Sequence, residues 1–225
     1  MNSIHPTAIV GPGVTLGEGN VIGAFAVIGG NVRLGDGNWI GAACIIGAPP
    51  EVRSHPHPVD WIAEAGVEGV RIGDRNVIRE AVQVHGGWKA PTVIGDDGFI
   101  MNQVYIGHDG ELGNHVTLAS SVTLGGHVTI RDGANLGLGT NVHQRRVVGT
   151  LAMVGMSSVV TKDVPAFAKA YGSPCRVEGI NVVGMERAGY AGDDIAWVRE
   201  WIASGSPADA VPPAGISAAL RGVGA

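Results

Sequence analysis

Residues 94–129 read IGDDGF IMNQVY IGHDGE LGNHVT LASSVT LGGHVT, and every hexad begins with an aliphatic residue. The same series runs from Ile4 to Ile46 and, after two interruptions, from Ile94 to Val160. A period of six over most of a chain is typical of hexapeptide-repeat parallel β-helices. The sequence therefore predicts an all-β prism with three hexads per coil, of about seven or eight coils at the usual spacing between strands.

Two positions of each hexad are expected to point inward, because alternate residues of a strand face opposite sides. One is the aliphatic residue, and the other is the fifth, which holds small or β-branched residues such as Val122, Val128 and Ala134. The second position is usually glycine, which suits a corner where φ is positive or where backbones crowd together. This pattern explains why the chain of 225 residues contains 37 glycines and only 5% aromatic residues.

The composition argues against several classes of protein. A formal net charge of −5 with no basic run is not expected of a nucleic-acid-binding protein. No apolar run is long enough to span a membrane, and Met1-Asn2-Ser3 leads straight into the repeat without the pattern of a signal peptide. Cys44 and Cys175 make no disulfide framework. We therefore expect a cytoplasmic protein.

Interruptions of the repeat divide the chain. The prism is predicted over residues 1–165, with a long loop at 48–69 and a shorter break at 86–93. Long excursions of this kind are more often functional than not. The remainder, 166–225, is predicted to contain one helix at about 193–203, which covers an end or side of the prism, followed by a frayed tail.

Histidines replace the expected residues at several corners. Adding one coil of 18 residues to His108 reaches Gly126, which precedes His127, and adding another reaches Gln144, which follows His143. These residues should therefore stack along one edge of the prism. Histidine is the natural base at neutral pH, and the carboxylate that follows His108 would orient it. The alternative is that histidines fall on polar corners by chance.

Several strings occur in a fixed order from residue 5 to about 200. They include Ile72-Gly73-Asp74-Arg75-Asn76, Gly107-His108-Asp109, Gly125-Gly126-His127-Val128, Val142-His143-Gln144, Asp163-Val164-Pro165 and Gly179-Ile180-Asn181. Their order and spacing resemble those of the UDP-N-acetylglucosamine acyltransferases of lipid A biosynthesis, within the hexapeptide-repeat acyltransferase superfamily. The resemblance implies a left-handed parallel β-helix and a homotrimer whose sites lie between subunits.

The resemblance also implies an activity: transfer of an acyl group from an acyl thioester to a nucleotide-linked amino sugar. His108 matches the general base of the family, Asp109 matches the acid residue paired with it, and Gly126 matches the glycine whose N–H faces the oxyanion. Positions that line the sugar-nucleotide and acyl clefts are matched by His85, His127, His143, Gln144, Asn181 and Arg187. Met156 matches the residue that ends the acyl groove, which predicts a short to medium acyl chain. No bound cofactor or metal is expected, and acyl-coenzyme A or an acyl-carrier protein would be the co-substrate.

Three departures from the family pattern leave the substrates open. The 48–69 loop has no lysine like the one that holds the acceptor in the family, and Tyr105 stands where the family has a histidine. The string Gly172-Ser173-Pro174 resembles the ending of coenzyme A-dependent acetyltransferases instead. The acceptor atom, O or N, and the donor, coenzyme A or acyl-carrier protein, therefore remain alternatives.

Two other functions share this fold. A γ-class zinc carbonic anhydrase would use histidine ligands, but its histidine five residues after His108 is Gly113 here, so a site with three protein ligands is incomplete. A non-catalytic scaffold would leave the stacked polar edge unexplained.

Arg146 is anomalous because it falls on a fifth position, and a guanidinium cannot remain unpaired inside a narrow prism. A local bulge that turns Arg145 and Arg146 outward is the favoured explanation. The alternative is contact between this arginine pair and substrate phosphates.

Overall fold

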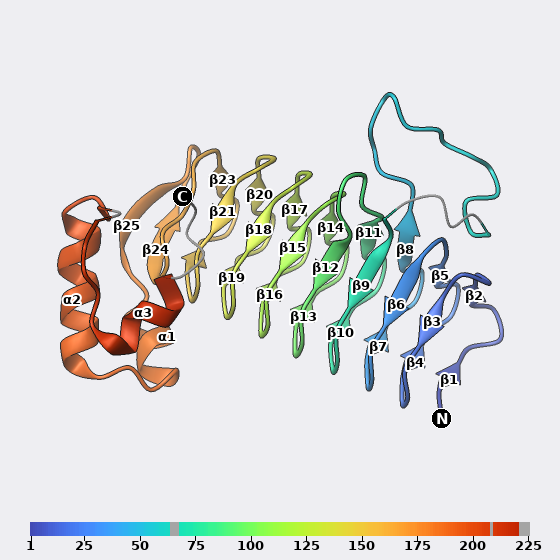
Figure 1. Ribbon diagram of the computed structural model, residues 1–225, viewed down its shortest axis with the longest axis horizontal. Coiled ribbons are helices and arrows are strands. Elements are labelled where there is room, and N and C mark those ends of the chain that lie inside the picture. The colour runs from blue at the N-terminus through green and yellow to red at the C-terminus, as the bar shows by residue number, and fades with distance from the viewer. Residues whose placement is uncertain (64–67, 208, 221–225) are drawn as a thin grey trace.

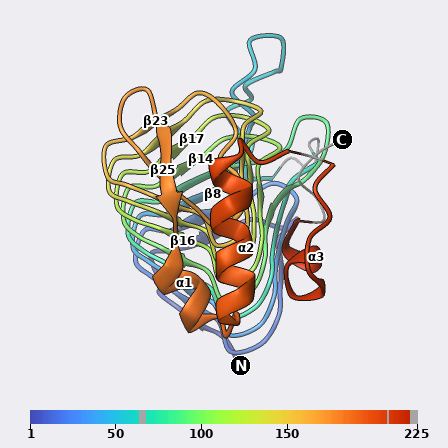
Figure 2. The ribbon, with the colours of Figure 1, turned by 90° about the vertical axis from the view of Figure 1, so that its left-hand side faces the viewer.

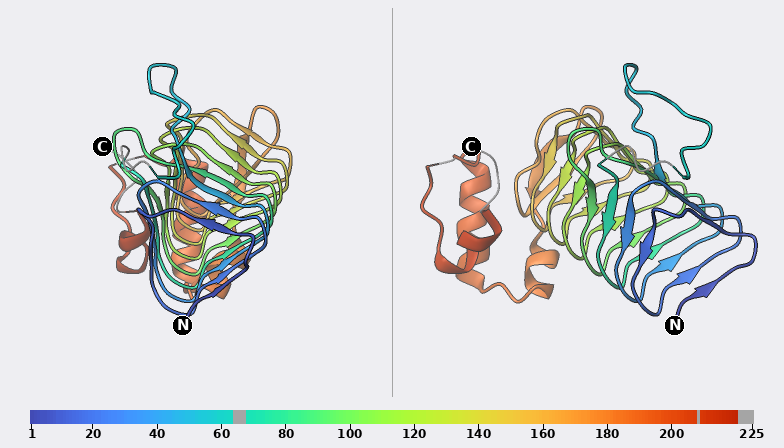
Figure 3. Two further views of the ribbon diagram at one scale, coloured as in Figure 1. Left: turned by 90° about the vertical axis from the view of Figure 1, so that its right-hand side faces the viewer. Right: turned by 45° about the vertical axis from the view of Figure 1, so that its right-hand side comes forward.

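The computed structural model describes residues 1–63, 68–207 and 209–220. Short strands wind into a long prism that begins at the N-terminus and ends against the helices of the C-terminal segment (Figure 1). Seen along its axis, the prism is three-sided, and its coils overlie one another from either end (Figures 2 and 3). The coiled all-β architecture predicted from the period of six is confirmed.

Each side of the prism is one sheet. Sheet A contains β1 (Ser3–Ile4), β4 (Val21–Ile22), β7 (Trp39–Ile40), β10 (Val77–Ile78), β13 (Phe99–Ile100), β16 (Thr117–Leu118), β19 (Asn135–Leu136), β22 (Met153–Val154), β24 (Ala168–Tyr171) and β25 (Arg176–Ile180). Sheet B contains β2 (Ile9–Val10), β5 (Val27–Ile28), β8 (Ile45–Ala48), β11 (Gln83–His85), β14 (Tyr105–Ile106), β17 (Thr123–Leu124), β20 (Asn141–Val142) and β23 (Val159–Val160). Sheet C contains β3 (Thr15–Leu16), β6 (Val32–Leu34), β9 (Val70–Ile72), β12 (Thr92–Ile94), β15 (Glu111–Leu112), β18 (Thr129–Ile130) and β21 (Val147–Val148).

The strands pair in parallel with the strands one coil away. Tyr105 pairs with Thr123, and Thr123 pairs with Asn141, so the repeat of 18 residues sets the register. The antiparallel exception among the described strands is β25, which folds back on β24. Because β24 continues sheet A beyond residue 165, this sheet has nine parallel strands, more than the seven or eight coils expected.

The interior follows the repeat. First and fifth positions are fully buried in the middle coils of the prism, as at Ile106, Leu118 and Val122, whereas Ile4 in the first coil is 43% exposed. In the N-terminal coils asparagine occupies the fifth position, and the side-chain oxygen of Asn20 accepts the backbone N–H of Asn38 over 2.8 Å. Asn38 accepts the backbone N–H of Asn76 in the same way, over 2.9 Å. These buried amides are tolerated because each one is hydrogen-bonded to its neighbours.

The corners need two different backbone properties. At the second position the coils approach closely: a Cβ added to Gly125 would lie 2.8 Å from the backbone nitrogen of Gln144. The fourth position has positive φ instead, with values of 58° at both Asp109 and His127. Asp, Asn and His adopt this conformation more readily than most residues. At Asp109 and His127 this backbone conformation places the side chains on a corner of the prism.

The long loop leaves the prism between β8 and β9, and residues 64–67 of it lie outside the described part of the chain. Its described part returns to the N-terminal coils, where Gly30 donates its N–H to the carbonyl of Ile62 over 3.1 Å. Gly29 is required here, because a Cβ would lie 2.7 Å from the Cα of Ile62. The loop is therefore seated on the prism at this point.

The C-terminal segment differs from the prediction of one helix and a frayed tail. The described residues form α1 (Val182–Arg187), α2 (Gly192–Ala203) and α3 (Ala214–Leu220). Helix α3 lies in the stretch expected to be frayed, yet Ile216 is fully buried in a second core with Met185 and Val198. Residues 221–225 of the expected tail lie outside the described residues. No helix within the described ranges has the length and apolar character needed to cross a membrane.

Candidate active site

The two interruptions of the repeat and the turn that holds His108 all lie on the edge between sheets B and C. Both interruptions leave the prism there, the long loop between β8 and β9 and residues 86–91 between β11 and β12. His108 lies in the next turn along this B–C edge. Its carbonyl accepts the N–H of His127 over 2.9 Å, and the carbonyl of Gly126 accepts the N–H of Arg145 over 3.0 Å. The structure thus stacks the residues around His108, Gly126 and His143 in successive coils.

His108 and Asp109 form a close pair. The Nδ1 atom of His108 lies 2.7 Å from Oδ2 of Asp109, and the two side chains are 15% and 2% exposed. The pair is therefore shielded from bulk water while the histidine keeps one open side.

The Asp109 carboxylate also holds the shorter excursion, residues 86–91. Its Oδ2 accepts the N–H of Trp88 over 3.0 Å, and its Oδ1 accepts the N–H groups of Lys89 and Ala90, both over 2.7 Å. Burial by itself would raise the pKa of Asp109, but the hydrogen bonds from His108 and from these three backbone groups outweigh it, and the pKa is lowered. Asp109 is therefore a carboxylate at neutral pH.

The ionised partner fixes the tautomer of His108. A carboxylate only accepts hydrogen bonds, so the proton of a neutral His108 must reside on Nδ1, which faces it. The lone pair is then on Nε2. This is the arrangement that a general base requires.

Gly126 lies directly against the open side of His108. A Cβ at Gly126 would stand 2.7 Å from both Nε2 and Cε1 of the histidine ring, so any side chain would displace the ring. Among the described residues, none accepts a hydrogen bond from the Gly126 N–H. The Gly126 N–H is therefore available as a hydrogen-bond donor close to the His108 ring. Such a donor is suited to bind a developing oxyanion.

His127 completes the cluster. Its ring stands edge-on to that of His108, with centroids 5.0 Å apart, and its Nδ1 lies 4.0 Å from Oδ1 of Asp109. Burial lowers the pKa of His127, and the charge of Arg145 adds to this effect against the opposing attraction of Asp109. A neutral His127 at pH 7 leaves His108 without a neighbouring imidazolium.

The same three residues are the one group of ligand type among the described residues whose donor atoms lie within 4.8 Å of one another. Their atoms do not fit a metal centre, because both oxygens of Asp109 are engaged by N–H donors and Nδ1 of His108 is engaged by Asp109. A cation would have to displace these hydrogen bonds. His85, the other ligand considered for a carbonic anhydrase site, is not a member of the group.

Comparison with known proteins identifies the family of this chain. Residues 163–203 match the family model described as UDP N-acetylglucosamine O-acyltransferase, domain 2. The structure of the UDP-N-acetylglucosamine acyltransferase of Francisella novicida superposes with a TM-score of 0.78 and 30% sequence identity, over 88% of this chain and 78% of that one. This chain belongs to the UDP-N-acetylglucosamine acyltransferase family. The Bacteroides fragilis member of the family superposes with a TM-score of 0.77 at 27% identity, over 88% of this chain and 83% of that one.

Curated members of the family are similar to a little over half of this chain. The acyl-[acyl-carrier-protein]–UDP-N-acetylglucosamine O-acyltransferase of Aliivibrio fischeri is 35% identical over 133 residues, which are 58% of this chain and 51% of the relative. The Vibrio campbellii enzyme is 45% identical over 129 residues, 56% of this chain and 49% of the relative. This chain thus matches about half the length of these curated relatives.

His85 joins the family site to the long loop. Its Nδ1 lies 2.8 Å from the carbonyl oxygen of Pro49, and its ring lies 5.2 Å from that of Tyr105. The hydroxyl of Tyr105 donates a hydrogen bond to the Glu51 carboxylate. Burial and then the Glu51 carboxylate raise the pKa of Tyr105, so its hydroxyl remains a donor. Tyr105, where the family has a histidine, is thus used here to hold the loop.

His143 and Gln144 lie one coil beyond Gly126 on the same edge, and both are exposed. Nδ1 of His143 lies 3.2 Å from the carbonyl oxygen of Gln144, a contact within the turn itself. Both side chains are therefore available to a ligand that extends along the B–C edge.

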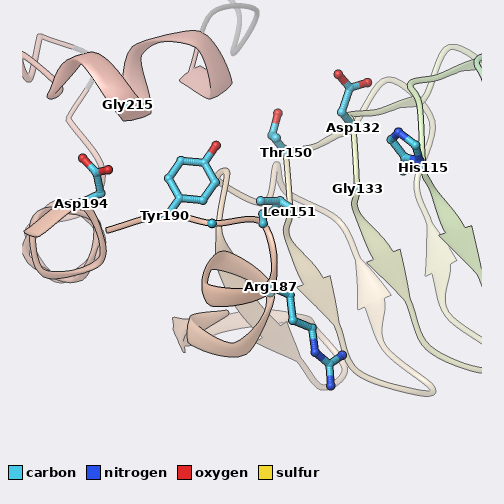
Figure 4. A pocket seen from close by; sticks show the side chains of 12 residues that line it. His115, Asp132, Gly133, Thr150, Leu151, Arg187, Tyr190, Asp194 and Gly215 are labelled. Carbon is cyan, nitrogen blue, oxygen red and sulfur yellow. The ribbon is translucent and has the colours of Figure 1, made fainter. Parts of the chain in front are cut away.

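Asn181 and Arg187 belong to a different part of the chain. Asn181 accepts the N–H of Gly184 as the N-cap of α1 and donates to the carbonyl of Leu151 over 2.8 Å, so it has a structural role within its own subunit. Arg187, at the end of α1, lines a cleft of about 740 Å³ between the helical segment and the turns that link sheets C and A (Figure 4). His115 lines the same cleft. A single chain does not bring Asn181 and Arg187 to the B–C edge.

Met156 lies in the turn between β22 and β23, which links sheet A to sheet B, and it is 66% exposed. The turn that holds His108 links sheet B to sheet C. Met156 is therefore placed on a different edge from His108 within one chain.

Arg146 does not sit at a bulge. The pairing of β21 with β18 is regular, with Thr129 opposite Val147, so the predicted bulge is wrong, although Arg145 is exposed as expected. Instead Arg146 is half-buried, and its guanidinium lies 3.2 Å from Asp163. The ion pair offsets the free-energy cost of burying an unpaired guanidinium, which made this position anomalous.

Two site residues were missed from the sequence. Trp88 lies with its ring perpendicular to that of His108, with centroids 6.3 Å apart, and the ammonium of Lys89 lies 4.1 Å from the centre of the Trp88 ring. The only signal was that the 86–91 interruption comes one coil before His108. The segment is held in place by hydrogen bonds from its backbone N–H groups to Asp109, which leave no pattern in a sequence.

Proposed function

We propose that this protein is an acyltransferase that moves an acyl group from a thioester to a hydroxyl or amine of a nucleotide-linked amino sugar, with His108 as general base. The observation that carries the proposal is the close approach of Gly126 to Nε2 of His108, which Asp109 holds in the basic tautomer; the Gly126 N–H has no acceptor among the described residues. The names of the relatives, which are acyl-[acyl-carrier-protein]–UDP-N-acetylglucosamine O-acyltransferases, supply the substrate class.

The reaction needs one proton acceptor and one oxyanion donor. Nε2 of His108 removes the proton from the acceptor O–H or N–H as that atom attacks the thioester carbonyl carbon. The C=O π electrons move to the oxygen, and the new C–O or C–N bond forms. When the tetrahedral intermediate collapses, the C–S bond breaks and the thiolate takes the proton from the His108 imidazolium.

Two neighbouring groups lower the barrier. Asp109 stabilises the imidazolium that forms during attack, because its carboxylate is 2.7 Å from Nδ1. The Gly126 N–H would donate to the oxyanion, and one such donor typically contributes about 3–4 kcal/mol. His127, neutral at pH 7, adds no positive charge that would disfavour the protonated base.

We further propose that the working unit is a homotrimer in the cytoplasm, where acyl-coenzyme A and acyl-carrier-protein thioesters are made. Arg187 and Met156 lie away from His108 in their own chain, so in this proposal they serve the site of a neighbouring subunit, and Asn181 caps the helix that carries Arg187. The donor is an acyl-carrier protein or coenzyme A thioester, and no further cofactor is required.

The proposal is tested with a matrix of substrates. Purified protein is incubated with a panel of nucleotide sugars, each paired with acyl-coenzyme A and with acyl-carrier-protein donors, and the products are examined by mass spectrometry. A new acylated nucleotide sugar in at least one pairing is expected, and tandem spectra assign it as an ester or an amide. If every pairing leaves the sugars unmodified, the proposal fails.

The metal alternative has its own test, because the cluster of His108, Asp109 and His127 is of ligand type. Since both oxygens of Asp109 and Nδ1 of His108 are already engaged in hydrogen bonds, we expect acyl transfer to survive dialysis against a strong chelator. Metal content is measured in the same samples. Stoichiometric zinc together with loss of activity on chelation would favour a carbonic anhydrase-like site instead.

A further inference from the structure

The 86–91 excursion presents a lysine beside the candidate base. Asp109 holds the three backbone N–H groups of residues 88–90, so the segment is fixed to the same carboxylate that orients His108. The path of the backbone is therefore rigidly related to the reacting atoms. A side chain carried on it can act on a substrate bound at His108.

The ammonium of Lys89 is held in place without being neutralised. Its Nζ lies 4.1 Å from the centre of the half-buried Trp88 ring, a cation–π contact. Within the described residues, no carboxylate forms an ion pair with this exposed lysine. The contact keeps the positive charge next to the aromatic ring that itself packs edge-on against His108.

Lys89 is one of three lysines in a chain whose formal net charge is −5. Lys162 and Lys169 lie toward the C-terminal end of the prism, beyond β23 and on β24. At the B–C edge, Lys89 before His108 and Arg145 after Gly126 provide cations on both sides of the base. A phosphate group is the anion that the proposed substrates carry.

We propose that Lys89, held by Trp88, binds a phosphate group of a bound substrate. This inference rests on the proposed acyltransfer to a nucleotide sugar. The acceptor's diphosphate is the favoured source, because a single sugar ring separates it from the reacting hydroxyl or amine. The phosphate of the donor lies at the far end of a pantetheine arm, much further from the thioester carbon at His108.

The test uses Lys89→Met, which retains most of the side-chain length and removes the charge, and Trp88→Leu, which removes the cation–π contact. The matched control is Lys169→Met, an exposed lysine on sheet A. Isothermal titration calorimetry measures binding of inorganic pyrophosphate and of uridine diphosphate, which requires no catalytic activity. Steady-state kinetics measures KM for the nucleotide sugar and for the acyl donor separately.

We expect Lys89→Met to weaken diphosphate binding and raise KM for the nucleotide sugar by about tenfold, the loss of one charge-assisted hydrogen bond. We expect kcat and the KM for the donor to change less than twofold, and Trp88→Leu to follow in the same direction. Lys169→Met should behave as wild type. A rise confined to the KM of the donor would assign the phosphate to the pantetheine arm, which also supports phosphate binding by Lys89.

Two results would overturn the inference. One is wild-type protein that binds neither pyrophosphate nor uridine diphosphate, and the other is equal binding by wild type and Lys89→Met. Both can be read from calorimetry when no acyl transfer is seen at all. Failure of the proposed function is thus distinguishable from failure of this inference.

Discussion

His108 carries the proposed chemistry through one nitrogen, and its other nitrogen is committed to Asp109 at 2.7 Å. Replacing it by alanine removes the base but little core packing, because it is a corner side chain. We expect His108→Ala to lower kcat by about 10²–10⁴-fold, the usual contribution of a general base. Single-turnover and steady-state rates of the purified variant measure this.

The matched control is His5→Ala, which alters an exposed histidine in the turn between β1 and β2, at the N-terminal end of the prism. It should retain wild-type kcat. Light scattering on both variants checks that the assembly is unchanged. If His108→Ala kept more than a tenth of wild-type kcat in an intact assembly, His108 could not be the base.

Asp109 links activity to stability through its ionisation. The hydrogen bonds that it accepts lower its folded-state pKa, so the carboxylate stabilises the fold above the unfolded pKa of about 3.9. That stability is lost as the pH falls through the lowered folded value. We expect Asp109→Asn to reduce the free energy of unfolding by about 1–3 kcal/mol at pH 7 and the difference to shrink below about pH 4.

Urea titrations of wild type and Asp109→Asn at several pH values measure this difference, with Asp60→Asn, an exposed loop carboxylate, as the control. A gap between wild type and variant that stayed constant from pH 7 to pH 3 would contradict the assignment. The variant should also lose activity, because an amide can present its NH₂ group to Nδ1 and favour the wrong tautomer of His108.

At the scale of residues, the sequence predicts what the period of 18 controls. His108, Gly126 and Gln144 fall in successive turns because strand register repeats with the coil. The hydrogen bonds that Asp109 accepts from residues 88–90 are not predictable in this way, because their donors are backbone N–H groups of an irregular segment. The pairing of Arg146 was missed for a related reason: its partner Asp163 lies in the next coil, where the repeat ends.

Among the elements, the loop at 48–69 is the most distinctive of this chain. Its described part is fastened to sheet B at its beginning, where Pro49 meets His85 and Glu51 meets Tyr105, and to the N-terminal coils at Ile62. These contacts hold the loop over the B–C edge, on the N-terminal side of His108. In this position it can shape the acceptor site.

Removing the phenolic hydroxyl of Tyr105 should weaken the attachment of the loop to sheet B. Tyr105 remains protonated because burial and Glu51 raise its pKa, so Tyr105→Phe deletes a donor at every working pH. One such hydrogen bond contributes about 1 kcal/mol or more when its acceptor is charged. We expect severalfold faster amide exchange in residues 49–63 and a higher KM for the acceptor, measured by hydrogen–deuterium exchange and steady-state kinetics.

Tyr171→Phe serves as control, because Tyr171 is exposed on β24. Exchange in the loop that was the same in Tyr105→Phe and wild type would show that the hydroxyl does not hold the loop.

Prediction of elements succeeded where periodicity was strong and failed where it was weak. Helix α2 was expected from its apolar stripe, and Val198 and Trp201 are indeed buried. Helices α1 and α3 have six and seven residues, too few for a helical period to stand out against Gly and Ala. They are stabilised by tertiary contacts instead, as the complete burial of Met185 and Ile216 indicates.

For the whole molecule, the three edges of the prism have different contents. The B–C edge carries His108, Gly126 and His127, the C–A edge carries the cleft with Arg187, and the A–B edge carries Met156. A substrate large enough to need all three cannot be bound by one chain. This separation is the physical reason for the proposed trimer, in which edges of different subunits meet. A period of six in one sequence predicts the prism, but it does not indicate which edges of different subunits meet in the assembly.

Met156 tests the assembly and the donor together. In the proposed trimer its thioether side chain, 66% exposed in a single chain, ends the acyl groove of a neighbouring site. A blocked groove excludes distal methylenes, each of which would contribute about 0.8 kcal/mol if buried. We expect wild-type protein to prefer short to medium acyl donors and Met156→Gly to accept longer ones, with Met156→Leu, of similar volume, unchanged. A series of acyl donors of increasing chain length, assayed at fixed acceptor with all three proteins, gives kcat/KM against length. Wild-type protein that used long chains as fast as short ones would refute the assignment, because the side chain would then not limit the groove.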